Sequence, residues 1–335
     1  MRLEDLYGQP IAQRQLRQSL ARGRISHAYL FSGLPGTGKK TAALAWAQAL
    51  NCPRRTGDDA CDQCPTCRGI QSGVHPDLIL VRPQEASIRL EQVREVRRRI
   101  TYGPCQARYL VVILVQAENL TLEAANALLK SLEEPSSRSV FVVVSDRPEE
   151  IPATVRSRCQ TISFRPIPRK LVAEFLRQKG VSQEDAEWLA TVSGGSLSRA
   201  EELAMQPAKR NWLLELWYRV WRESGLEVLR LAKEAAAADG SEIMTAFTTW
   251  LRDLWVWART GQKEWLRDPR AIENLPAGVS GAEIKRLRRT LAAAWAGLER
   301  SVQEQLLWEV LFLQWPRTDG EERRTRGGKG SRRSV

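Results

Sequence analysis

The segment from Gly33 to Thr41 combines residue types that can hold a phosphate. It reads Gly-Leu-Pro-Gly-Thr-Gly-Lys-Lys-Thr and lies between an apolar run at 28–31 and a helix-like segment at 41–50. Glycines let successive backbone N–H groups converge on an anion, and the N-terminus of the following helix adds partial positive charge. The residues that fit this pattern are Gly33, Gly36, Gly38 and Lys39. The sequence therefore predicts a phosphate-binding loop between a strand and a helix.

The residues that would bind Mg²⁺ beside this loop are missing. Such a loop ends in a Ser or Thr whose hydroxyl binds Mg²⁺, but Lys40 stands there and Thr41 comes one residue late. An acidic residue is also needed at the end of a neighbouring strand, where the sequence has Val115 and Gln116. Glu118 is acidic but lies two residues further on. We expect ATP hydrolysis to be lost, whereas binding of ATP without hydrolysis stays open because the loop glycines and lysine persist.

Four cysteines follow the loop at a spacing that can surround one metal ion. Cys52, Cys61, Cys64 and Cys67 form a C-x₈-C-x₂-C-x₂-C pattern. Thiols stay reduced in the cytoplasm, and four closely spaced thiolates can bind one tetrahedral Zn²⁺. With four cysteine ligands, no position remains for a catalytic water, so the predicted zinc is structural. We expect a zinc module at 52–67, inserted as a hairpin; two disulfides are the alternative.

An arginine precedes the last β-like run of the first half of the chain. The segment 148–159 leads from an apolar run at 140–145 into a β-like run at 160–164, and it contains Arg158. An arginine held at a domain edge can reach out of its own subunit. In nucleotide hydrolases, an arginine supplied by a neighbour stabilises charge on the γ-phosphate and contributes about 10³–10⁵ in rate. From spacing alone this signal is weak, because an arginine at the end of a loop is usually solvated or salt-bridged.

Alternating strand and helix patterns must position these residues. The β-rich apolar runs lie at 28–31, 75–81, 108–115, 140–145 and 160–164. The helical patterns between them lie at 41–50, 88–100 and 122–134. Strands that alternate with helices are typical of a parallel sheet, and continuous apolar runs are typical of strands buried on both faces. We therefore predict an α/β domain with a P-loop over residues 1–166.

Helical periodicity replaces the β-rich runs from residue 170 onward. Residues 167–206 suit a small helical domain, and 207–316 suit a second domain of long helices. Eleven of the twelve tryptophans lie at or beyond Trp188. Their helical spacing beside leucines favours an aromatic core over the alternative of exposed rings that stack on bases. The tail at 317–335 is rich in Gly, Arg and Ser and is predicted to be disordered.

Composition and charge limit the classes of function. Apolar residues make up 43% of the chain and charged residues 27%, which is ordinary for a globular protein. No run reaches the roughly 18 apolar residues of a membrane span, and the N-terminus lacks the apolar region of a signal peptide, so we expect a cytoplasmic protein without membrane contact. The net charge is +12, with basic clusters in the tail and between Arg94 and Arg99. Such clusters suit contact with nucleic acid or acidic protein surfaces.

Several stretches, in order, carry a family likeness. They are Tyr7-Gly-Gln9, His27-Ala-Tyr-Leu-Phe31 with its loop, the four-cysteine module, Asn126-Ala-Leu-Leu-Lys-Ser-Leu-Glu-Glu-Pro135, Ser157-Arg-Cys159 and Gly194-Gly-Ser-Leu-Ser-Arg-Ala200. Over roughly the first 200 residues the sequence resembles the AAA+ subunits of the bacterial replicative clamp loader. The helical remainder matches only in kind. The resemblance implies an AAA+ P-loop parallel-sheet domain with a zinc module, a small helical lid and a C-terminal all-α collar for oligomerisation.

The resemblance also implies roles for individual residues. Arg158, in the Ser-Arg-Cys motif, is implied to be an arginine finger that acts on the ATP of an adjacent ATPase subunit, and the four cysteines are implied to bind zinc. Ser145 is implied to occupy the sensor-one position. Arg199 matches the sensor-two arginine only approximately, because Ser198 intervenes where the arginine of the ATPase subunits follows Gly-Ser-x directly. This shift, Lys40 and the neutral strand end depart from the pattern of the active gamma/tau subunits.

The function implied by the resemblance is that of a non-catalytic subunit of the clamp loader within the DNA polymerase III holoenzyme, which loads the sliding clamp on primed DNA. The implied partners are the gamma/tau and delta subunits in a hetero-pentameric ring and, through the complex, the sliding clamp and primer-template DNA. One alternative is an ATP-hydrolysing subunit of the gamma/tau type. Another is a stand-alone zinc-containing nucleic-acid binder, suggested by the net charge of +12, although the phosphate loop has no role in it.

Overall fold

The computed structural model describes residues 2–316 except 56, 136–137, 274–278 and 300–302. The chain divides into two compact units, one formed by residues up to 172 together with 195–199, the other by 173–194 and the chain from 200 on. Among the described helices, none is both long and apolar enough to cross a membrane. The predicted disordered tail, 317–335, lies outside the described residues.

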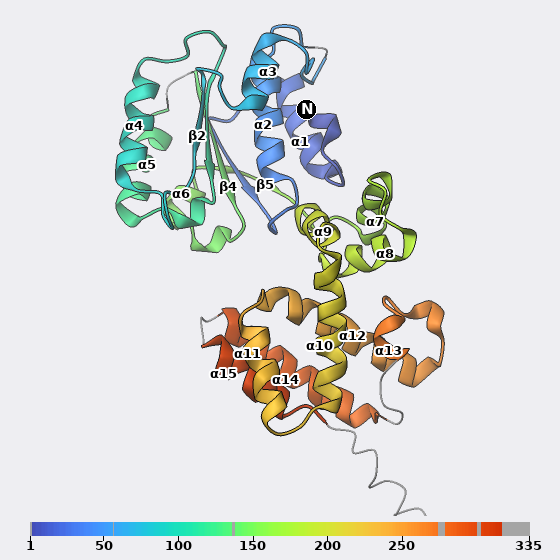
Figure 1. Cartoon of the computed structure of the whole chain (residues 1–335). Helices are drawn as coiled ribbons and strands as arrows, with labels where there is room; N and C mark the ends of the chain where they lie inside the picture. Colours follow the sequence, from blue (N-terminus) through green and yellow to red (C-terminus); the bar gives the residue numbers. More distant parts are fainter. Residues whose placement is uncertain (1, 56, 136–137, 274–278, 300–302, 317–335) are drawn as a thin grey trace, which may run out of the picture. The chain divides into compact units, whose positions relative to one another are not determined.

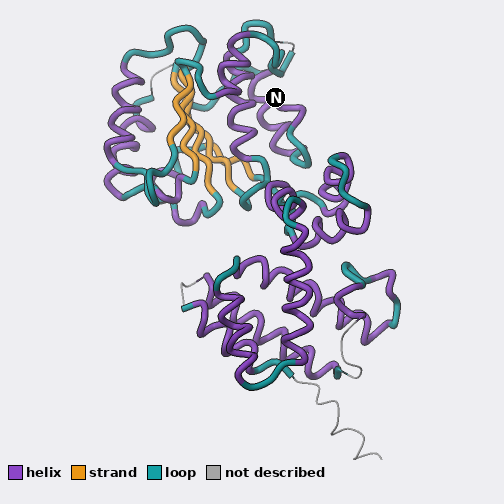
Figure 2. The backbone as a smooth tube through the Cα atoms, in the orientation of Figure 1, coloured by secondary structure: helices purple, strands orange, loops and turns teal. Residues whose placement is uncertain are grey.

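A parallel sheet of five strands forms the centre of the first unit (Figures 1 and 2). In chain order the strands are β1 (Ala28–Ser32), β2 (Leu78–Val81), β3 (Leu110–Val115), β4 (Ser139–Ser145) and β5 (Gln160–Ser163). In space their order is β2-β3-β4-β1-β5, and every pairing is parallel. The predicted α/β class with a parallel sheet is confirmed.

Helices cover both faces of this sheet, as Figure 1 shows. They are α1 (Pro10–Ala21), α2 (Lys39–Asn51), α3 (Pro65–Ser72), α4 (Leu90–Thr101), α5 (Leu122–Glu133) and α6 (Ala153–Arg156). Successive strand residues point to opposite faces, so Val111 joins the core under α1, α2 and α3, whereas Val112 joins the core under α4, α5 and α6. Burial on both faces explains why the strands are continuously apolar.

Strand register brings the carboxyl ends of three strands to one edge of the sheet. Ser32, the last residue of β1, pairs with Ser145, the last residue of β4. Val115, the last residue of β3, pairs with Val144. The loops that follow these strands therefore start side by side, which is the usual position of ligand sites in open parallel sheets.

The second unit is helical and has an aromatic core. Its helices are α7 (Arg169–Gln178), α8 (Gln183–Val192), α9 (Leu197–Ala204), α10 (Pro207–Arg222), α11 (Leu226–Ala236), α12 (Gly240–Thr260), α13 (Arg270–Glu273), α14 (Gly281–Glu299) and α15 (Glu304–Leu313). The first residues of α7 and α9 belong to the first unit. The ring of Trp217 lies 5.0 Å from Phe247 and 5.6 Å from Trp221, Trp250 and Trp315. All five are buried, so the predicted aromatic core is confirmed here. The boundary at 206/207 between lid and collar stays a prediction.

A buried carboxylate fixes the turn that precedes β3. Asp77 is fully buried and accepts hydrogen bonds from the backbone N–H groups of Cys105, Gln106 and Ala107 at 2.6, 2.7 and 2.7 Å. Burial by itself would raise the pKa of Asp77, but the three N–H donors together lower it below the ordinary value. The charged form of Asp77 therefore contributes to the stability of this unit.

We expect Asp77→Ala to destabilise the first unit by about 3 kcal/mol or more, because three backbone N–H groups lose a buried, charged acceptor. A depressed folded-state pKa gives stability that is present above the ordinary carboxyl value of about 4 and is lost as pH falls through the folded-state value. Thermal unfolding between pH 7 and pH 3 should show this loss in the wild type and less of it in Asp77→Asn. An identical pH dependence in the two proteins would contradict the assignment.

Candidate functional site

The predicted phosphate loop joins β1 to α2 in a conformation that glycine permits. Gly33, Gly36 and Gly38 have φ values of 149°, 71° and 91°, a region that side chains disfavour. A Cβ at Gly36 would also lie 2.0 Å from the Ser196 hydroxyl. The backbone N–H of Leu197 donates to the carbonyl of Gly36 at 3.0 Å. The segment 195–199 thus packs directly on the loop.

Gln9 anchors this loop. In the sequence it was noted only as part of the stretch Tyr7-Gly-Gln9. Its side-chain amide donates to the carbonyl oxygens of Thr37 at 3.3 Å and Arg165 at 2.7 Å. Its amide oxygen accepts from the N–H of Arg165 at 3.1 Å. Gln9 is buried, so these bonds tie the loop to the chain that leaves β5. No catalytic residue pattern could have revealed this role.

Lys39 begins α2 and points its ammonium back into the loop. The side chain is 4% exposed, and its Nζ donates to the carbonyls of Gly33 and Leu34. It also forms an ion pair with Asp146 Oδ1 at 2.7 Å. The next residue, Lys40, is exposed, and partial burial together with Arg82 lowers its pKa. A second ammonium therefore stands where a metal-binding hydroxyl was expected.

The end of β3 offers no carboxylate at its last strand position or at the position that follows. Val115 closes β3, and Gln116 turns away with φ of 55° and an exposed side chain. Glu118 accepts a hydrogen bond from the N–H of Asp146 at 3.4 Å. The nearby acid that contacts the loop is therefore Asp146, which the sequence analysis missed. Its position directly after β4, next to the predicted sensor Ser145, is the signal that could have drawn attention to it.

Ser145 and Arg199 both lie in the unit that carries the loop. Ser145 is buried, and its hydroxyl accepts from the N–H of Arg147 at 3.1 Å. The Nε and Nη2 atoms of Arg199 are buried without a hydrogen-bond partner among the described residues. Guanidinium N–H groups without an acceptor are suited to an anion. The glycine cradle and Arg199 fit the phosphates of a nucleotide, but the residues expected for Mg²⁺ do not fit that metal.

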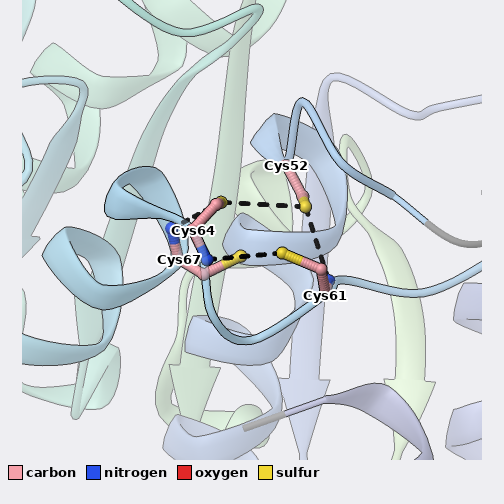
Figure 3. A group of neighbouring side chains, drawn as sticks. All are labelled: Cys52, Cys61, Cys64 and Cys67. Carbon is pink, nitrogen blue, oxygen red and sulfur yellow. Dashed lines mark hydrogen bonds between the residues drawn. The ribbon is translucent and has the colours of Figure 1, made fainter.

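The four cysteines converge into one cluster, as Figure 3 shows. Their sulfur atoms all lie within 4.8 Å of one another, and the Sγ atoms of Cys52 and Cys64 are 3.9 Å apart. Zn–S bonds of about 2.3 Å in a tetrahedron place sulfurs about 3.8 Å apart. N–H groups of Gln63 and Cys64 lower the pKa of the Cys61 thiol to about 6. The cluster is therefore a possible metal site whose donor set fits a structural zinc.

The expected hairpin in this module is wrong. Cys52 follows the end of α2, and Cys64 caps the start of α3 by accepting the N–H of Cys67 at 3.4 Å. Among the described residues between Cys52 and Cys67, none belongs to a strand of the sheet. Asp59 instead accepts the N–H groups of Leu3 and Glu4, each at 2.9 Å. The module is a loop between helices, and within it the N–H groups of Cys61, Cys64 and Cys67 donate to cysteine sulfurs rather than to a partner strand.

Arg158 lies just before β5, at the sheet edge opposite the phosphate loop. Its Nη1 donates to the carbonyl of Thr154 at 2.8 Å, and its Nη2 pairs with Glu133 at 2.6 Å. Its side chain is 35% exposed. Ser163, at the other end of β5, pairs with Ser32 next to the loop. At about 3.3 Å per residue, the two ends of β5 are about 10 Å apart, and Arg158 precedes the end that is further from the loop.

Comparison with known proteins relates these residues to a family. Residues 8–168 match the family model described as "DNA polymerase III, delta subunit". DNA polymerase III subunit delta' of Bacillus subtilis is 36% identical over 206 residues, which cover 60% of this chain and 62% of that protein. Over about 60% of its length the chain is therefore similar to subunits of DNA polymerase III. The tau subunit of the same organism is 33% identical over 211 residues, 61% of this chain and 37% of that protein.

The chain spans less than two thirds of the length of these DNA polymerase III subunits. Solved structures give longer but weaker matches. A gamma subunit-related protein of DNA polymerase III from Thermotoga maritima is 17% identical, with a TM-score of 0.42 over 89% of this chain and 97% of that chain. The RuvB Holliday junction branch migration motor of the same organism is 13% identical, with a TM-score of 0.45 over 93% and 89%.

The structure divides the predicted residues into three places. The loop glycines, Lys39 and Ser145 lie at the carboxyl edge of the sheet, and the segment that carries Arg199 packs on the loop. The cysteine cluster lies between α2 and α3. Arg158 lies at the opposite edge of the sheet. The loop and Arg158 thus lie at different edges of the sheet.

Proposed function

We propose that this chain is a delta'-type subunit of the clamp loader, without ATPase activity of its own, that supplies Arg158 to the ATP of a neighbouring subunit. The observation that carries the proposal is the position of Arg158 at the sheet edge opposite the chain's own loop. There it is partly exposed and held by Glu133. An arginine in that position serves a nucleotide outside this chain, as arginine fingers supplied by a neighbour do.

The chain's own loop supports the absence of hydrolysis. Lys40 replaces the hydroxyl that would bind Mg²⁺, and Val115 and Gln116 replace the strand-end carboxylates. Without a metal to neutralise charge on the γ-phosphate and an acid to orient water, phosphoryl transfer loses its main electrostatic support. The retained glycines then serve as a rigid turn between β1 and α2.

The remaining features fit the same role. The cysteine cluster binds one structural zinc in this proposal. The gamma/tau and delta subunits are the proposed ring partners, with contacts through the helical collar. The sliding clamp and primer-template DNA are reached through the assembled complex. These partners are proposed because the relatives of this chain are themselves DNA polymerase III subunits.

The isolated chain is expected to show no ATP turnover above background with Mg²⁺. The reason is that the Mg²⁺ ligands are missing both from the loop, at Lys40, and from the end of β3, at Val115 and Gln116. A coupled ATPase assay on the full chain measures this, and the matched variant Lys39→Ala is expected to give the same background rate. Turnover that depends on Mg²⁺ and disappears in Lys39→Ala would contradict the proposal.

A subunit of the gamma/tau type is the second candidate. The tau subunit of Bacillus subtilis matches at 33% identity, and the loop keeps its glycines and Lys39. The ATPase assay separates the two candidates, because a gamma/tau-type subunit would turn over ATP. The neutral end of β3 is why we place this candidate second.

A further inference from the structure

The ammonium of Lys39 has no N–H group left for a phosphate. A lysine ammonium carries three donors, and here it contacts three oxygens: the carbonyls of Gly33 and Leu34 and Oδ1 of Asp146. The side chain is buried, and one of the three contacts is a full ion pair at 2.7 Å. The cation that phosphate loops direct at the β- and γ-phosphates is thus already neutralised from within the chain.

The fold fixes Asp146 in this position. Asp146 directly follows Ser145, and Ser145 pairs in register with Ser32, the residue before Gly33. The N–H of Asp146 donates to Glu118 at 3.4 Å, which holds the turn from a third strand end. The carboxylate is therefore carried to the mouth of the loop by strand pairing.

We propose that Asp146 is an internal counter-ion that closes this loop to nucleoside triphosphates. A triphosphate must break the Lys39–Asp146 pair and then stand beside the carboxylate, and both steps weaken its binding. The rest of the cradle is retained, since the loop glycines keep their conformation and two nitrogen atoms of Arg199 lack partners among the described residues. The inference does not depend on Arg158 and concerns this chain alone.

The test is a calorimetric titration of the full chain with ATP and, separately, with inorganic tripolyphosphate. Asp146→Asn removes the charge and keeps the shape. We expect it to tighten binding of both ligands by about tenfold or more, because one charge at ~4–6 Å shifts the equilibrium of a neighbouring charged group by ~10 to 10³. The matched control is Glu150→Gln, which removes the same charge from an exposed residue that pairs with Arg147 in the same segment. It is expected to change affinity by less than about twofold.

A double-mutant cycle shows whether the gain acts through Lys39. Lys39→Ala is expected to weaken binding, because the Asp146 carboxylate then faces the phosphates without its partner, and to reduce the gain produced by Asp146→Asn. Asp146→Ser repeats the measurement with a smaller neutral side chain, and unfolding temperatures verify that each variant is folded. Equal affinity in the wild type and both Asp146 variants, or a gain that is as large in the Lys39→Ala background as in the wild-type background, would overturn the inference.

Discussion

Replacing Arg158 with alanine is expected to lower ATP turnover at the neighbouring subunit's site by about 10³-fold or more, the usual contribution of an arginine finger. The guanidinium would stabilise charge on the γ-phosphate only in the transition state, so ATP binding to the complex should change much less than turnover. The measurement is DNA-stimulated ATPase and clamp loading by the reconstituted complex. The total ATPase rate of the complex should fall by the fraction that is contributed by the one site that Arg158 serves.

Arg156→Ala is the matched control for this experiment. Arg156 is exposed and is the last residue of α6, two positions before Arg158. Its replacement by alanine removes the same charge from the same segment. It should leave turnover within about twofold of the wild type, as expected of an exposed charge. Full turnover and clamp loading with Arg158→Ala would show that the arginine is only a partner of Glu133. Loss of complex assembly in both variants would point to an interface role instead.

Loss of the proposed zinc is expected to have the second large effect. Structural zinc sites contribute about 10–16 kcal/mol of apparent binding free energy in small peptides, and that energy is folding energy. Cys67 is fully buried within the cluster. We expect Cys67→Ser to lower the unfolding temperature by about 10 °C or more, since 1 kcal/mol corresponds to about 2–4 °C in a unit of this size. Metal analysis should find one zinc per chain in the reduced wild type.

Cys105→Ser is the control for the cysteine experiment, because Cys105 is exposed and lies outside the cluster. It should retain both the zinc and the unfolding temperature. A strong chelator should reproduce the effect of Cys67→Ser in the wild type and add little in the variant. Protein that contains much less than one zinc per chain, or that is indifferent to the chelator, would contradict the assignment.

Much of the first unit could be predicted from short-range patterns. The apolar run predicted at 108–115 contains β3, and the run at 140–145 lies within β4. The helix α3 was not predicted, because its eight residues overlap the cysteine spacing and carry few apolar side chains. The hairpin was wrong for the same reason: the cysteine pattern specifies a cluster of ligands but not the backbone that presents them.

The sequence by itself determined the parts of this protein whose physics is local. Cysteines within sixteen positions can meet without long-range folding, and the glycines of the loop meet a backbone requirement of their own segment. The tertiary structure alone decided which carboxylate meets Lys39 and which edge of the sheet carries Arg158. Lys39 and Asp146 are 107 positions apart, and only the pairing of β1 with β4 brings them to 2.7 Å. Strand order and register arise from the packing of the whole sheet between its helices, so no local pattern specifies them.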